Sequence, residues 1–292
     1  MKKLIPLLLC LALLLGGCGA QKNYEIVATT APVWQFARAV CEGTGLEVGL
    51  VISDSVSCLH DYTLSVRQMV AVEKARVVIL SGGSLEEFME DALREKDVRI
   101  ECSGGVDLLP MEHDHETHDH EEYDHDGEYD PHIWLDPDNA AVMTRNIADG
   151  LSALYPEYAE TFAVNAKAYC ARLADLKAEG QAELSALSSR DLITFHDGFA
   201  YFAAAYDLEI LAAIEEESGS EASAKDLKEM IGLVRSAQVP AVFVEKDGSR
   251  AAASVIADET GCAVGVLDTM LSGSDYFEAM RANVLAVKEA MQ

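Results

Sequence analysis

Short apolar segments alternate with helix-like segments in the first part of the chain, and this pattern predicts its fold. The expected strands are 24–30, 46–53, 76–80 and 97–102, and the expected helices are 31–41, with Pro32 in its first turn, 65–75 and 84–96. Strands that alternate with helices form parallel sheets covered on both faces. The first part of the chain is therefore expected to fold as one β-α lobe.

The pattern changes from residue 137, where a long helical stretch with few Gly or Pro residues begins. It is broken only around Tyr155-Pro156, so it predicts a helical spine that joins two lobes. The alternation then resumes. The expected strands are 191–195, 208–214, 241–245 and 262–268, and the expected helices are 199–206, 223–237, 249–261 and 274–291. Two β-α lobes imply a cleft between them, and ligands of such sheets bind beyond the carboxyl ends of the strands.

The first residues, MKKLIPLLLCLALLLGGC, have the pattern of a secretory signal. Two lysines precede an apolar run from Leu4 to Leu15, which is shorter than the roughly 20 residues that a membrane span needs. The ending L-G-G-C resembles the bacterial lipoprotein signal, in which the cysteine becomes the lipidated first residue. Removal of 1–17 would leave Cys18 as a lipid anchor on the outer face of the membrane. The alternative is an ordinary signal peptide that is cut nearby.

The charge of the chain is strongly negative and restricts its partners. Without Lys2 and Lys3, 20 of the 22 basic residues remain against 50 acidic ones, a formal charge of −30. Such a surface repels a phosphate backbone, which excludes nucleic acid as a partner, and it attracts cations such as divalent metals. High solubility is a simpler explanation of the same charge.

Five of the eight histidines lie in one acidic run. They are His113, His115, His118, His120 and His125. The composition of this run cannot bury a core, so disorder without metal is expected. The run is interpreted as a weaker, metal-collecting segment, and the alternative is a solvated spacer.

The remaining histidines are His60, His132 and His196, and each is expected at the cleft side of a lobe. His60 follows the second strand, His132 lies in DPHIWLDP, and His196 ends the strand DLITF. Three imidazoles and one carboxylate suit four-coordinate zinc, with Zn–N distances of about 2.0–2.1 Å. Each histidine has a simpler interpretation as a hydrogen-bonded loop residue.

Four carboxylates accompany these histidines. Asp268 and Glu245 end their strands and are candidates for the fourth ligand, although residues there commonly cap the next helix. Asp61 and Asp197 each follow a histidine directly. One interpretation is that they accept hydrogen bonds from the imidazoles and orient them, and the alternative is that they are solvated.

Six motifs in chain order carry a resemblance to a known family. They are LHDYTLSVRQM, RVVILSGGSLEEFM, DPHIWLDPDNA, ITFHDGFAYFAAAYDL, SAKDLKEMIGLVRSAQVPAVFVEKD and VGVLDTM. Together they resemble the metal-binding cluster (cluster A-I) of solute-binding proteins that serve ABC importers, specifically the high-affinity zinc-binding type. The resemblance covers nearly the whole chain after the signal. It implies two lobes joined by a long rigid helix, with metal held between them.

The resemblance also implies a ligand set. The HDY motif places a ligand at His60, PHIWLDP one at His132 and HDGFAYF one at His196, and VGVLDTM offers Asp268 as the fourth. Manganese-type relatives have glutamate in place of the third histidine, so His196 favours zinc. A histidine-rich acidic insert before PHIWLDP is typical of the zinc branch.

The expected organisation has four parts. They are a signal peptide at 1–17, an N-terminal metal-binding lobe at 18–136 with the histidine-rich loop at 112–130, a helical linker at 137–189 and a C-terminal metal-binding lobe at 190–292. The expected function is an extracytoplasmic, monomeric protein that captures Zn²⁺ and delivers it to an ABC-transporter permease, without enzymatic activity.

Three alternatives stay open at this point. The first is a manganese or other divalent-metal receptor of the same family. The second is a zinc hydrolase, but no H-E-x-x-H or G-x-S-x-G motif occurs in the chain. The third is a surface metal buffer whose main binder is the histidine-rich run.

Overall fold

The computed structural model describes residues 23–53, 59, 62–111, 129–215 and 223–292. The signal and Cys18, the ligand candidate His60 with Asp61, and all five histidines of the acidic run lie outside these residues.

The N-terminal lobe is built on a four-stranded parallel sheet in the order β2-β1-β3-β4. The strands are β1 (Ile26–Ala28), β2 (Val48–Leu50), β3 (Val77–Leu80) and β4 (Arg99–Glu101). The central strands, IVA and VVIL, are buried along their whole length, as expected for strands covered on both faces. The helices are α2 (Ala31–Val40), α3 (Val66–Lys74) and α4 (Glu90–Leu93). A capping box between Ser65 and Gln68 starts α3.

The helix predicted over 84–96 is wrong in its extent. The chain forms a 3₁₀ turn (Glu87–Met89) and only one α-helical turn, α4. Gly82, Gly83 and Ser84 all have positive φ, so the chain turns tightly before the helix. This turn surrounds the buried carboxylate of Glu86, which accepts hydrogen bonds from Ser81 N at 2.7 Å and Gly82 N at 3.0 Å. Burial raises the pKa of Glu86, although these hydrogen bonds act to lower it.

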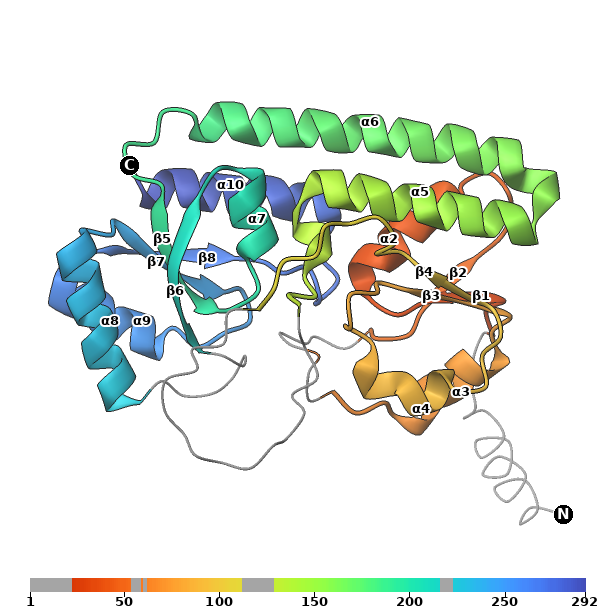
Figure 1. The fold of residues 1–292 in the computed structure, drawn as a ribbon, viewed down its shortest axis with the longest axis horizontal. Coiled ribbons are helices and arrows are strands. Elements are labelled where there is room, and N and C mark those ends of the chain that lie inside the picture. Colours follow the sequence, from red (N-terminus) through yellow and green to blue (C-terminus); the bar gives the residue numbers. More distant parts are fainter. Residues whose placement is uncertain (1–22, 54–58, 60–61, 112–128, 216–222) are drawn as a thin grey trace, which may run out of the picture.

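The long helical stretch folds back on itself as two helices that lie side by side, α5 (Pro137–Leu154) and α6 (Ala159–Leu184) (Figure 1). The break falls at Tyr155-Pro156, where it was predicted. α5 packs on α2 and β4 of the first lobe, whereas α6 continues along both lobes to α10 (Tyr276–Ala290). The spine is thus a helical hairpin, in which α6 is the helix that spans both lobes.

The C-terminal lobe repeats the parallel plan with strand order β6-β5-β7-β8. The strands are β5 (Asp191–His196), β6 (Glu209–Glu215), β7 (Ala241–Glu245) and β8 (Ala263–Leu267). Its other helices are α7 (Ala200–Ala205), α8 (Ala224–Ala237) and α9 (Ala251–Thr260). The predicted fold class, two parallel-sheet β-α lobes with a long helix, is confirmed.

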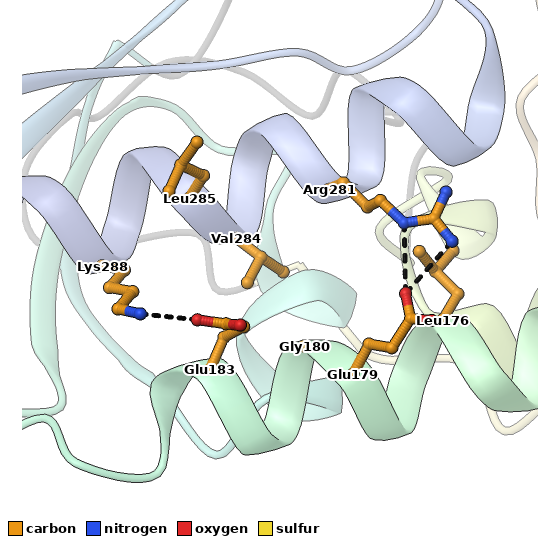
Figure 2. A pocket seen from close by; sticks show the side chains of 8 residues that line it. All are labelled: Leu176, Glu179, Gly180, Glu183, Arg281, Val284, Leu285 and Lys288. Carbon is orange, nitrogen blue, oxygen red and sulfur yellow. Dashed lines mark hydrogen bonds and ion pairs between the residues drawn. The ribbon is translucent and has the colours of Figure 1, made fainter.

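The groove between α6 and α10 shows how the spine is fastened to the second lobe (Figure 2). Ion pairs cross it at both ends, Arg281 to Glu179 at 3.1 Å and Lys288 to Glu183 at 2.5 Å. Between them, Gly180 is buried, and a Cβ there would lie 2.4 Å from Cε1 of Tyr206. The glycine therefore permits the ring of Tyr206 to pack against α6.

The two lobes also contact each other directly. Trp134 Nε1 donates a hydrogen bond to Thr269 O at 2.9 Å, and Tyr276 Oη donates one to Trp134 O at 2.7 Å. Gln35 of α2 donates to Ser274 O at 2.8 Å and accepts from Tyr276 N at 2.9 Å. These contacts, of which the two made by Trp134 are buried, hold one lobe against the other in this structure. Among the described residues, no helix has the length and apolar character that a membrane crossing requires.

Candidate metal site

His132 lies just before a 3₁₀ turn (Ile133–Leu135) that leads into α5, and only 2% of its surface is exposed. Asp130 Oδ1 accepts hydrogen bonds both from the backbone N–H of His132 and from its ring Nδ1, each at 2.8 Å. A carboxylate only accepts hydrogen bonds, so Nδ1 carries a hydrogen and Nε2 of the neutral ring keeps its lone pair. The ring therefore presents a basic nitrogen on the side away from Asp130.

His196 ends β5 in the other lobe and is equally buried, with 2% exposed. Its Nε2 lies 3.5 Å from Nε2 of His132, and the two rings stand nearly perpendicular at 84°. Two nitrogens that share one tetrahedral zinc at about 2.0–2.1 Å lie roughly 3.3–3.4 Å apart. The structure thus brings two of the three predicted histidines, 64 positions apart in the chain, to the spacing that a shared cation needs.

Gly198 has no side chain, and the two imidazole rings occupy the space that a side chain would fill. A Cβ at this position would lie 2.7 Å from Cδ2 and Nε2 of His196 and 2.9 Å from Cε1 of His132. Carbon atoms normally pack at about 3.5–4.0 Å, so any side chain at 198 would displace both imidazoles. The glycine of the HDG segment is therefore a steric requirement of the site.

Glu245 ends β7, the strand beside His196, and the register of the sheet points to its level. β5 and β7 are neighbours, with Thr194 opposite Phe243, so continuation of the register places His196 level with Glu245. Neighbouring strands are about 4.7–4.9 Å apart, and side chains at one level share a face. Glu245 is 6% exposed.

Asp268 follows β8 and is engaged elsewhere. Its Oδ2 accepts from Lys246 Nζ at 3.0 Å and from Ser274 Oγ at 2.6 Å, and its Oδ1 accepts from Met270 N at 2.7 Å. In the register of β7 and β8, Glu245 lies opposite Leu267, so Asp268 is one position beyond the level of Glu245. In this structure, both oxygens of Asp268 serve the 268–274 turn.

The acidic surroundings change the ionisation of His132. Burial acts to lower its pKa, but the hydrogen bond and charge of Asp130, with the charges of Glu245 and Asp197, outweigh burial and raise the pKa above its usual value. The same negative charges favour a bound metal cation in place of the proton.

Within the described part of the chain, neither Glu245 nor Asp268 completes the pair as a third ligand. There, no group of three or more His, Cys, Asp or Glu side chains is arranged to hold a metal ion. His60 lies outside the described residues, although its neighbour Leu59 is buried. The described portion of the site is thus the pair of imidazoles from two lobes.

Two residues beside the histidine pair, Asp130 and Gly198, were not predicted from the sequence. Asp130 falls inside the range 112–130 expected for the loop, but it is buried, with 3% exposed, and it is bonded to His132. The available signals were the spacing of Asp130 two residues before His132 and of Gly198 two residues after His196. Asp197, which was predicted beside a histidine, contributes a charge near His132.

The base of the histidine-rich segment lies beside the site. Pro110 and Tyr129 form an antiparallel bridge, and Asp130 N donates to Leu109 O at 2.9 Å. Leu109 N donates in turn to Tyr201 Oη of α7 at 2.9 Å. The described residues on either side of 112–128 are therefore bonded to each other, and Tyr129 and Asp130 lie three and two positions before His132.

Comparisons with known proteins agree with this architecture. The model of the family described as zinc-uptake complex component A, periplasmic, matches residues 26–290. The zinc-binding lipoprotein AdcA of Streptococcus pneumoniae is 32% identical over 99% of this chain and 61% of its own length. The chain thus spans about three fifths of that relative.

Solved structures with similar folds include a crystal structure of ZnuA, with a TM-score of 0.77 and 27% identity, covering 93% of this chain and all of that one. The zinc-bound ZnuA-like domain of AdcA from Streptococcus pneumoniae has a TM-score of 0.76 and 28% identity, covering 92% of this chain and 99% of that one.

Proposed function

This chain belongs to the family of periplasmic zinc-uptake components, and from that premise we propose that it captures Zn²⁺ between its lobes and delivers it to an ABC-transporter permease. The observation that carries the proposal is the 3.5 Å separation of the Nε2 atoms of His132 and His196, one from each lobe. His60 is the proposed third ligand, and a carboxylate or water completes the shell.

Zinc is favoured over manganese by the chemistry of the donors. Both described ligands are imidazole nitrogens, and a third imidazole is proposed at His60. Nitrogen-rich sites suit zinc, whereas manganese prefers carboxylate and water oxygens. Zinc-bound relatives of the same fold are consistent with this choice.

For the carboxylate, Glu245 is a better candidate than Asp268. Glu245 is buried level with His196 and its charge acts on His132. Asp268 would first have to release Lys246, Ser274 and the N–H of Met270. The proposed set is therefore His60, His132 and His196 with Glu245 or water.

A receptor fits this site better than a hydrolase. A zinc hydrolase needs an open coordination position and a base beside it. With Glu245 as the fourth ligand, three imidazoles and a buried carboxylate would close the shell around the ion. We expect no turnover of peptide, ester or phosphate substrates by the zinc-loaded protein. Zinc-dependent turnover would favour the hydrolase alternative.

Two further parts of the proposal concern regions outside the described residues. Cys18 is proposed to carry the lipid that holds a monomer at the outer face of the membrane. His113, His115, His118, His120 and His125 are proposed to collect zinc weakly. Their support is the base of the segment, which is fixed next to His132 by the bonds to Leu109 and Tyr201.

Calorimetry on the protein without its signal tests the function. We expect one tight zinc equivalent that is lost in His60→Ala, His132→Ala and His196→Ala. Deletion of 113–125 should leave this tight equivalent intact. Retention of tight binding in the single variants, with its loss in the deletion, would establish a surface buffer in place of a receptor.

A further inference from the structure

We infer that Asp130 is the positioning residue that makes His132 a ligand through Nε2, by fixing both the tautomer and the direction of its ring. This inference rests on the proposed function of the site. Asp130 does not itself bind the metal in this assignment.

The geometry of Asp130 is specific to this role. One oxygen, Oδ1, receives the backbone N–H and the ring Nδ1–H of the same residue, both at 2.8 Å. The ring is thereby tied to its own backbone and cannot rotate without the loss of a buried hydrogen bond. Asp130 and His132 are 3% and 2% exposed, so water does not readily replace the lost partner.

Among the other described surroundings of His132, Trp134 only restricts the ring, whereas Nε2 of His196, 3.5 Å from Nε2 of His132, can donate or accept and so does not by itself select a tautomer. Trp134 meets the His132 ring at 5.4 Å between ring centroids and 60°, and His196 meets it at 5.1 Å. Aromatic edges and faces restrict rotation, but they do not distinguish a hydrogen on Nδ1 from one on Nε2. The Asp130 carboxylate makes this distinction because it only accepts hydrogen bonds.

A purely structural role of Asp130 can be separated from this one. The segment that carries Asp130 is anchored independently, by Asp130 N to Leu109 O and by Leu109 N to Tyr201 Oη. Neither bond involves the carboxylate. Tyr201→Phe removes one anchor of the segment and leaves the carboxylate–imidazole pair untouched, so it is the matched control.

The experiment compares wild type, Asp130→Ala, Asp130→Asn and Tyr201→Phe in two measurements. The first is the tautomer of His132 in the metal-free protein, from ¹⁵N chemical shifts of the imidazole above its titration range. The second is the zinc dissociation constant, from competition with a chelator. Outer partners of metal-bound histidines typically affect affinity by about 10–100-fold.

We expect hydrogen on Nδ1 in wild type and in Tyr201→Phe, with zinc affinities that differ little. Asp130→Ala should shift the ring toward hydrogen on Nε2 and weaken zinc by about 10–100-fold. Asp130→Asn retains an oxygen that accepts from both donors, so it should recover the tautomer and part of the affinity.

Two results would overturn the inference. One is an unchanged His132 tautomer in Asp130→Ala, and the other is an equal loss of zinc affinity in Tyr201→Phe. Failure of the proposed function is distinguishable, because wild type would then bind no zinc while the tautomer measurement on metal-free protein would still report on Asp130.

Discussion

Replacement of Gly198 by alanine is the sharpest perturbation of the proposed zinc site. The new methyl would lie 2.7 Å from Nε2 of His196 and 2.9 Å from Cε1 of His132. Normal packing needs about 3.5–4.0 Å, so the rings must together retreat by roughly 1 Å. Zn–N distances in protein sites fall within about 0.2 Å of 2.0–2.1 Å, so a shift of this size would distort the coordination that the two nitrogens share.

We expect Gly198→Ala to weaken zinc binding by roughly 100-fold. This is the upper end of the loss of metal affinity that is typical when a residue supporting a metal ligand is changed. Gly198 is not among the glycines with positive φ, so its backbone accepts alanine, and the effect arises from the contact with the rings. Overpacking of this kind should lower the free energy of unfolding of the metal-free protein by about 1–3 kcal/mol.

Gly232→Ala is the matched control, because a Cβ at this exposed position in α8 meets nothing within 4 Å. It should leave zinc affinity unchanged and stabilise the helix by up to about 1 kcal/mol. Isothermal titration with zinc and thermal denaturation without metal give both quantities. Wild-type zinc affinity in a folded Gly198→Ala protein would refute the claim that both imidazoles converge beside residue 198.

Three other predictions address the carboxylate, the proton and the loop. Glu245→Gln should weaken zinc binding more than Asp268→Asn, because Glu245 is buried and Asp268 is already bonded to Lys246. Competition titrations in which only Asp268→Asn lost zinc affinity would contradict this ranking. The pKa of His132 is raised, and zinc binds only the neutral ring. As the pH is lowered, zinc affinity should therefore start to fall at a pH above about 6.5, the ordinary pKa of histidine. Equal calorimetric affinity at about pH 5 and pH 7.5 would exclude ligation by this histidine. Deletion of 113–125 should remove weak zinc equivalents only, and equilibrium dialysis that showed no change in total zinc would refute a collecting role for the loop.

Much of the fold was predictable because parallel, buried strands are marked by short apolar runs. The strand AVFVE was placed at 241–245, and β7 has the same bounds. The resemblance to the zinc-binding solute-binding proteins is confirmed by the family match. The helix predicted over 84–96 was wrong in its extent, because positive φ at Gly82, Gly83 and Ser84 and the buried Glu86 make the start of that segment a turn.

The candidate residues of the site were predictable from the sequence, but their contacts were not. The order of elements placed His132 and His196 at the cleft, but the contact between them depends on how the lobes pack, which periodicity does not encode. Asp268 ended a strand as clearly as Glu245 did. Its engagement by Lys246, 22 positions away, appears only when β7 and β8 lie side by side.

The central claim is that imidazoles from both lobes bind one zinc ion. A crystal structure of the zinc-loaded protein, with anomalous scattering measured at the zinc edge, tests it most directly. We predict one strong peak about 2.0–2.1 Å from Nε2 of both His132 and His196. A strong peak bound only by histidines of the segment 113–125, with none between His132 and His196, would contradict it.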